Sequence, residues 1–114
     1  MDKEKLKSDI LNLILERGEG GVTFANLVNE IDGIKGDREW GILDYNWIVW
    51  SGISIEAIQC LNELQSEKKI YKKTTSVLVY AADGTILRLP VVEKKIKYKE
   101  PHWIPIIYLP VGVL

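Results

Sequence analysis

The sequence has few of the residues that support metal, redox or acid–base chemistry. Among 114 residues there is one cysteine, Cys60, and one histidine, His102. A single cysteine excludes an internal disulfide, so we expect a reducing, cytoplasmic location. Cys60 and His102 are also too few to form a transition-metal site, and they do not form an evident pair of catalytic nucleophile and general base. We therefore expect no metal, no cofactor and no catalytic residues, and we expect that the protein is not an enzyme.

Long apolar segments are also absent. The apolar stretch at residues 103–114 is shorter than the roughly 20 residues of a membrane span, and Pro105, Pro110 and Gly112 interrupt it. The amino terminus begins with mixed charge and no apolar run follows it, which argues against a signal peptide. We expect no membrane partner.

Neither sign of charge dominates, because 15 Lys and Arg stand against 16 Asp and Glu. The distribution is nevertheless uneven: residues 1–50 carry six basic and ten acidic side chains, and residues 51–114 carry nine and six. The basic excess lies in two clusters, Lys68, Lys69, Lys72 and Lys73, then Lys94, Lys95, Lys97 and Lys99. If they converge in space, they make a local positive face on a nearly neutral protein.

Apolar material is plentiful, at 46% of residues with four Trp, five Tyr and one Phe. That is enough for one domain with its own core. Helical spacing of the apolar residues predicts three helices, at about residues 3–17, 24–31 and 55–67. Gly18 ends the first helix, and Thr23 and Ser54 are suited to cap the other two.

Residues 37–50 favour a further helix capped by Asp37. Four apolar residues recur there at helical spacing, namely Trp40, Leu43, Trp47 and Trp50. Against a helix, Gly41 lies in its interior, and residues 45–50 are rich in the aromatic and β-branched residues typical of strands. A strand remains the alternative.

After residue 69 the apolar period changes to two, which predicts strands. The first is short, at residues 70–73. Residues 76–81 and 85–91 then predict a hairpin around Asp83-Gly84, and residues 93–99 a further exposed strand.

The run from Trp47 to Leu61 resembles a helix-turn-helix signature. Its turn glycine, apolar residue, capping serine and packing residues are Gly52, Ile53, Ser54, Ile58 and Leu61. The continuation from Leu61 to Ile70, through Leu-x-x-Leu into Glu-Lys-Lys-Ile, resembles the passage from recognition helix to wing in winged-helix proteins. Three features depart from the family: Ile48 where a small residue is usual, a long stretch between Thr23 and Ser54, and residues 93–114 outside the pattern.

The resemblance implies an α+β, winged-helix fold. Its expected parts are a three-to-four-helix bundle with a helix-turn-helix, a β-hairpin wing and an apolar carboxy-terminal extension. We assign residues 1–92 to the winged-helix domain and residues 93–114 to the extension. That extension packs either on the same domain or on a dimer partner, because so apolar a tail is poorly suited to water.

The same resemblance implies a protein that binds double-stranded DNA, in transcription control or mobile-element biology. The alternative is a winged-helix protein-interaction module without DNA binding. The candidate DNA-binding residues are Ser54, Gln59, Asn62, Ser66, Lys68, Lys69, Lys72, Lys73 and Arg88. Gln59 and Asn62 are suited to adenine edges, but they also fit an ordinary solvated helix face.

Lysines 68–73 are suited to phosphate contacts, and equally to a solvated strand edge. For Lys94 to Lys99 we favour the solvated edge. We expect Trp47 and Trp50 in the core, whereas Trp40 and Trp103 remain candidates for an exposed surface that binds a second subunit. A homodimer through that surface or the tail is therefore a further expectation.

Overall fold

The amino-terminal helix, α1 (Lys3–Arg17), forms where the sequence predicts it. The computed structural model describes residues 2–112, and in it Asp2 caps α1 by accepting a hydrogen bond from the Lys5 backbone N–H. Gly18 ends the helix with a φ of +55°, and one 3-10 turn, η1 (Gly18–Gly20), follows. The predicted apolar face of α1 is buried.

The other two expected helices are confirmed. They are α2 (Phe24–Glu30) and α3 (Ile55–Ser66). Thr23 begins α2 with a capping box, in which its hydroxyl and the Asn26 side chain each accept the other's backbone N–H. Ser54 caps α3 by accepting a hydrogen bond from the Ala57 N–H. Local signals therefore set where these helices begin.

The helix expected over residues 37–50 is wrong. The segment is an antiparallel hairpin of β1 (Lys35–Ile42) and β2 (Trp47–Ile53), joined by the 3-10 turn η2 (Leu43–Tyr45). Trp40 lies opposite Trp50 across the hairpin, so cross-strand pairing produces the spacing that also fits a helix. Gly41 permits the close approach, since a Cβ there would lie 2.0 Å from the Trp47 carbonyl oxygen.

The helix-turn-helix predicted over Trp47 to Leu61 is wrong, because its first helix does not form. Gly52 has the expected positive φ, +88°, and Ser54 caps the following helix. The segment before the turn, however, is strand β2 rather than a helix. The chain therefore enters α3 from a strand.

The hairpin expected over residues 76–91 is also wrong. The predicted strand at residues 70–73 is confirmed as β3 (Ile70–Thr74), but α4 (Val77–Ala82) follows it. Ser76 caps α4 through the Leu78 N–H. A helical turn carries the Tyr80 side chain into the core, and this long-range packing overrides the strand propensity of the valines. Residues 85–101 contain no strand beyond an isolated bridge at Val91, so the exposed strand expected at 93–99 is wrong as well.

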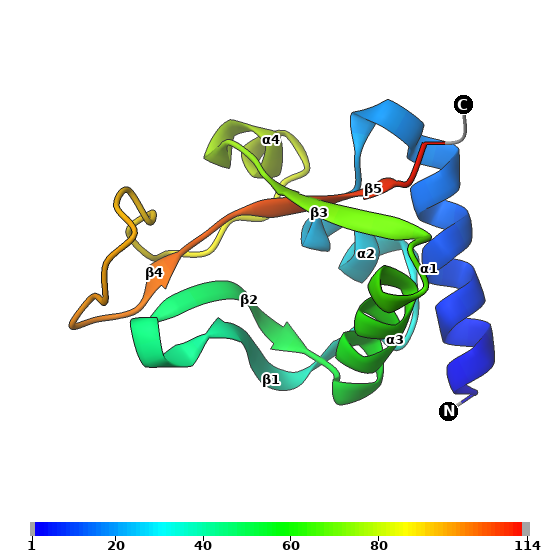
Figure 1. Cartoon of the computed structure of the whole chain (residues 1–114), viewed down its shortest axis with the longest axis horizontal. Coiled ribbons are helices and arrows are strands. Elements are labelled where there is room, and N and C mark those ends of the chain that lie inside the picture. The colour runs from blue at the N-terminus through cyan, green and yellow to red at the C-terminus, as the bar shows by residue number, and fades with distance from the viewer. Residues whose placement is uncertain (1, 113–114) are drawn as a thin grey trace.

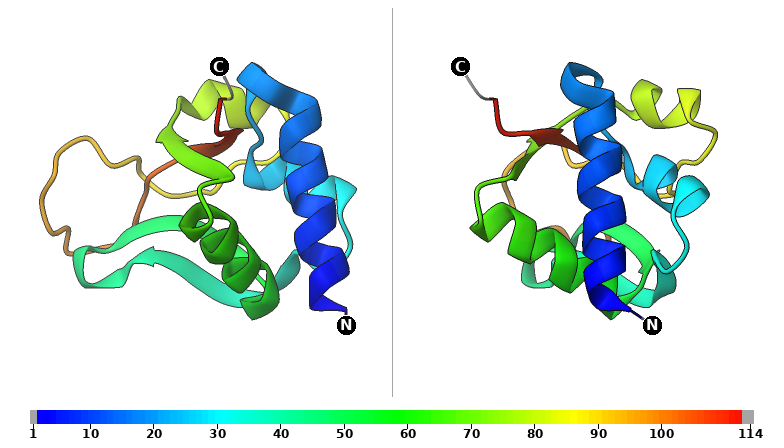
Figure 2. Two further views of the ribbon diagram at one scale, coloured as in Figure 1. Left: turned by 45° about the vertical axis from the view of Figure 1, so that its right-hand side comes forward. Right: turned by 90° about the vertical axis from the view of Figure 1, so that its right-hand side faces the viewer.

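Residues 102–110, which the sequence assigns to an extension, supply two strands, β4 (His102–Trp103) and β5 (Ile106–Pro110). β4 pairs in parallel with β2, and β5 pairs antiparallel with β3 and makes a bridge to Val22. Figures 1 and 2 show this segment running from the tip of the β1–β2 hairpin to α1. Val113 and Leu114, the end of the expected apolar tail, lie outside the described residues.

Aromatic side chains in the core join α2, β2, α4 and β4. Trp50 stacks on Phe24 and on Tyr80, and Trp103 meets Tyr80 edge to face with ring centroids 4.9 Å apart. Trp50 and Trp103 are buried, whereas Trp47, which we expected in the core, is partly exposed. None of the helices described here has the length and hydropathy needed to cross a bilayer.

Candidate functional site

The candidate DNA-binding residues of α3 divide between a structural serine and three exposed side chains. Ser54 is buried, and its hydroxyl donates to the Gly33 carbonyl oxygen while it accepts from the α3 amino terminus. Both hydrogen-bonding capacities of that hydroxyl are therefore used inside the fold. Gln59, Asn62 and Ser66 are exposed on α3.

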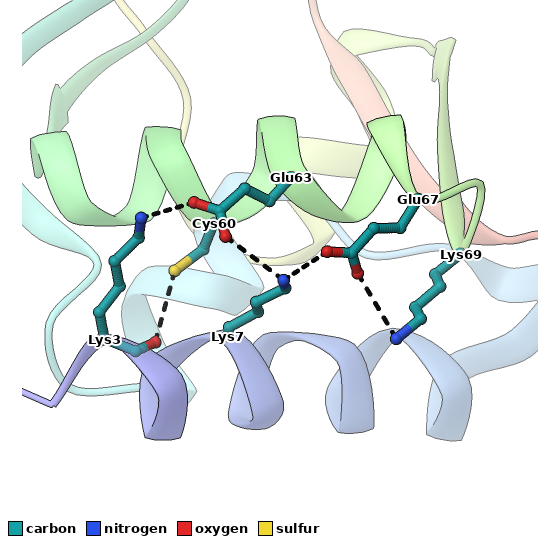
Figure 3. A network of polar contacts seen from close by, with 6 residues as sticks. All are labelled: Lys3, Lys7, Cys60, Glu63, Glu67 and Lys69. Atoms are coloured by element: carbon teal, nitrogen blue, oxygen red, sulfur yellow. Dashed lines mark hydrogen bonds and ion pairs between the residues drawn. The ribbon is translucent and has the colours of Figure 1, made fainter.

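Glu63, near the carboxy-terminal end of α3, and Glu67, which caps that end, both lie against α1 (Figure 3). Glu63 pairs with Lys3 and with Lys7, and Lys7 also pairs with Glu67 at 2.6 Å. Glu67 completes the network through Lys69, at 3.5 Å. These contacts neutralise carboxylates that would repel a phosphate backbone.

Charge and burial shift the pKa values of this network. The hydrogen bond from Lys3 lowers the pKa of Glu63, and the hydrogen bond from Lys7 lowers the pKa of Glu67. The same contacts raise the pKa values of Lys3 and Lys7. Burial raises the pKa of the Cys60 thiol, whose S–H lies 3.7 Å from the Lys3 carbonyl oxygen, so Cys60 is the core thiol that its apolar helix face predicts.

The first lysine cluster begins at the turn between α3 and β3. Lys68 adopts a left-handed conformation, with a φ of +59°, and is exposed. Lys69 takes part in the ion pair with Glu67. Lys72 and Lys73 lie exposed on β3. Arg88 is exposed in the irregular segment after α4, since the hairpin in which we expected it does not form.

Lys72 and Lys73 border a hollow between the β1–β2 hairpin and strand β3. This hollow, here called the tryptophan groove, has a volume of about 320 Å³. Its lining residues are Trp40, Gly41, Ile42, Trp47, Val49, Lys72, Lys73, Thr74, Ile104 and Ile106. The interior is thus mostly apolar, and both of its charged residues are lysines.

A second hollow adjoins the tryptophan groove and shares Trp47, Thr74 and Ile104 with it. This loop hollow has a volume of about 270 Å³. Two residues of the second lysine cluster, Lys94 and Lys95, line it together with Glu93. Two lysines of each cluster therefore line adjoining hollows that share three residues, and we call Lys72, Lys73, Lys94 and Lys95 the lysine rim.

Hydrogen bonds hold the second cluster against the tip of the β1–β2 hairpin. The Trp47 indole N–H donates to the Ile96 carbonyl oxygen at 2.9 Å, and the Asn46 amide donates to the Tyr98 carbonyl oxygen at 2.7 Å. The Tyr98 hydroxyl accepts hydrogen bonds from the backbone N–H groups of Glu93 and Lys94. The loop that carries Lys94 and Lys95 is thus joined to the tip of the hairpin, beside which it ends in Figure 2.

A separate hollow, of about 700 Å³, lies between α1 and the end of α2. Its charged lining residues are Asp2, Lys5, Asp9, Glu16, Glu30 and Asp32. Five acids and one lysine make this surface negative, so positive and negative side chains are segregated on a chain of nearly zero net charge.

Sequence reasoning identified Lys72 and Lys73 and missed most of what surrounds them. It set Lys94 and Lys95 aside as a solvated edge and assigned Trp47 to the core. The sequence pattern of residues 93–101 contained no signal that this loop contacts the β1–β2 hairpin. His102, the lone histidine, lines neither hollow and stacks on Tyr98 with ring centroids 3.7 Å apart.

Across residues 2–112 no group of three His, Cys, Asp or Glu side chains is placed to hold a metal ion. The site is therefore defined by lysines, tryptophans and aliphatic side chains. No family model, no curated protein and no solved structure matches the chain.

Proposed function

We propose that this chain is a winged-helix domain with insertions that binds DNA through its lysine rim. The observation that carries the proposal is that four lysines, from two clusters distant in the sequence, line two adjoining hollows. Lysine side chains bind phosphates as point charges, and such contacts supply much of the affinity for DNA. A transcriptional regulator or a mobile-element accessory protein would use binding of this kind.

The order of elements supports the winged-helix part of the proposal. Three helices, α1, α2 and α3, precede the paired strands β3 and β5, as three helices precede a two-stranded wing in the family. On this interpretation the β1–β2 hairpin is an insertion between the second and third helices. Residues 75–105 are a second insertion, between the two wing strands.

The charge on α3 argues for phosphate binding at the lysine rim rather than along that helix. Its exposed residues Gln59 and Asn62 are neutral, it carries no Lys or Arg, and Glu56 stands in its first turn. Gln59 and Asn62 therefore remain candidates for base contacts only, once the lysines have positioned the duplex.

Salt dependence tests the proposal. We expect a random-sequence duplex to bind at low ionic strength, about 50 mM, and to lose affinity steeply by about 200 mM. The double variant Lys72→Gln/Lys73→Gln should bind more weakly. Its slope of log affinity against log salt should fall by about 0.9 for each phosphate that the variant no longer neutralises. Fluorescence anisotropy of a labelled duplex measures both quantities.

The matched control is Lys5→Gln/Lys35→Gln, which removes the same charge from lysines that line neither the tryptophan groove nor the loop hollow. Its affinity and salt slope should stay close to those of the unaltered protein. Absence of duplex binding at the lower salt concentration would contradict the proposal.

One observation favours the alternative, a protein-interaction module. Leu78 on α4 is 78% exposed, and Val79 beside it is also exposed. Exposed apolar side chains of this size are typical of surfaces that meet another protein. If DNA fails to bind, this surface of α4 becomes the leading candidate for a partner contact.

A further inference from the structure

The tryptophan groove has the chemistry of a site for a flat, apolar group. Trp40 and Trp47 are both partly exposed and both line it. Ile42, Val49 and Ile104 complete an apolar wall. Its volume, about 320 Å³, lies at the lower end of the roughly 300–1,000 Å³ found for ligand sites.

The lysines at the border of the groove favour a ligand that carries negative charge beside its flat group. Lys72 and Lys73 stand on one side, and Lys94 and Lys95 line the adjoining loop hollow beyond Trp47. Glu93 is the one acid in the combined lining. A ligand that fits both features has an aromatic body with anionic groups on either side of it, as a nucleotide within a strand does.

A paired base cannot use this site, because its two faces are covered by its neighbours in the duplex. An unpaired base exposes a face on which an indole ring can stack, with little dependence on sequence. Lysines beside such a stacking site hold the flanking phosphates, and the two features together are typical of single-strand binding.

Trp47 is held in position before any ligand arrives. Its indole N–H donates to the Ile96 carbonyl oxygen, and its ring contacts the Tyr45 ring edge to face with centroids 5.5 Å apart. A side chain already fixed in this way loses little conformational freedom on binding.

We propose that the tryptophan groove binds an unpaired base of DNA, with the flanking phosphates on the lysine rim. The proposal rests on the proposed function and narrows its substrate to DNA that contains an unpaired strand, such as a duplex with a single-stranded tail.

The test compares a blunt duplex with the same duplex bearing a short oligothymidine tail, at one salt concentration. A second tailed duplex carries abasic residues in place of the thymidines, so it has the same phosphates without bases. We expect the thymidine tail to increase affinity more than the abasic tail does. Trp47→Ala should lower affinity for the thymidine tail about 5- to 150-fold more than it lowers affinity for the abasic tail, the range expected for one stacked base.

The matched control is Tyr71→Ala, which removes an exposed aromatic ring from β3 outside the groove lining. It should change neither affinity. Near-ultraviolet circular dichroism checks that Trp47→Ala stays folded. Independently of any variant, the thymidine tail should quench the intrinsic tryptophan fluorescence of the unaltered protein, and the abasic tail should not.

The failures of the two proposals are distinguishable. Equal affinity for thymidine and abasic tails, with unchanged fluorescence, would overturn the base-binding groove while blunt-duplex binding still supports the proposed function. Lack of binding to every one of these DNAs would overturn both.

Discussion

Tyr80 and Tyr108 are both fully buried, yet their hydroxyls have different surroundings. The Tyr80 hydroxyl accepts from the Phe24 N–H at 3.2 Å and donates to the Ile106 carbonyl oxygen at 2.6 Å. The Tyr108 hydroxyl has no hydrogen-bond partner among the described residues. Burial raises the pKa of both phenols above its ordinary value, because the charged phenolate is disfavoured away from water.

At the residue scale we expect Tyr80→Phe and Tyr108→Phe to differ in their effect on stability. Tyr80→Phe leaves a buried N–H and a buried carbonyl without this partner, which costs about 1–3 kcal/mol of unfolding free energy. Tyr108→Phe removes an unpaired hydroxyl and should be neutral or slightly stabilising. Urea denaturation of the two variants measures the difference, and equal destabilisation would contradict the hydrogen-bond assignment.

At the element scale, an ion-pair network joins α1 to α3. Lys7 lies between Glu63 and Glu67, and its side chain is 17% exposed, less than either carboxylate. Folding lowers the pKa values of both glutamates through these lysines. The resulting stabilisation is present above the ordinary glutamate pKa, about 4.3, and is lost as the pH falls through the lowered values.

We therefore expect Lys7→Met to make the melting temperature less sensitive to acid. The unaltered protein should lose more thermal stability between neutral pH and about pH 3 than the variant does, because the variant already lacks part of the network. Thermal melts across this pH range, followed by circular dichroism, measure the effect.

The control for this prediction is Lys5→Met, which breaks the Lys5–Asp9 pair within α1 and leaves the α1–α3 ion pairs in place. It should preserve the acid dependence that arises from Glu63 and Glu67. If both variants respond to pH alike, the network does not couple the two helices.

At the scale of the whole molecule, the carboxy-terminal segment closes the fold. β5 lies beside β3, bridges Val22 and packs against α1. Five residues of this segment, Trp103, Pro105, Ile106, Tyr108 and Leu109, are buried. The apolar tail that suggested a dimer therefore finds its partners, as far as residue 110, within its own chain.

Truncation tests this closure. A chain that ends at residue 101 should lose cooperative unfolding and its near-ultraviolet circular dichroism, since removal of several large core side chains costs about 2–5 kcal/mol for each one. A chain that ends at residue 112 is the control and should unfold like the full chain. A cooperative transition in the shorter form would show that β4 and β5 are dispensable.

Local chemistry made α1, α2, α3 and β3 predictable. Each helix begins at a residue whose side chain accepts a hydrogen bond from the first turn, namely Asp2, Thr23 and Ser54. Lys72 and Lys73 could be identified as site residues because an exposed strand next to a helix end already places them at the surface. Such features depend on neighbours within a few positions along the chain.

Residues 37–50 and 76–91 were decided by distant contacts. The spacing of Trp40 and Trp50 fits both one face of a helix and a cross-strand pair in an antiparallel hairpin. Only the contacts that these residues make in the folded chain favour the hairpin. The valines of α4 favour a strand, but Tyr80 makes two hydrogen bonds when the segment is helical. The tryptophan groove depends on the hairpin, which supplies Trp40 and Trp47, so these tryptophans could not be assigned to it from their spacing alone.

The sequence by itself determined the helix caps, the α+β composition and two separate lysine clusters. Only the tertiary structure decided that Lys72 and Lys94 line adjoining hollows, that Trp47 is partly exposed, and that residues 102–110 supply two strands. The physical reason is the range of the interactions. Caps act over one turn, whereas sheet pairing and core packing join residues that lie dozens of positions apart.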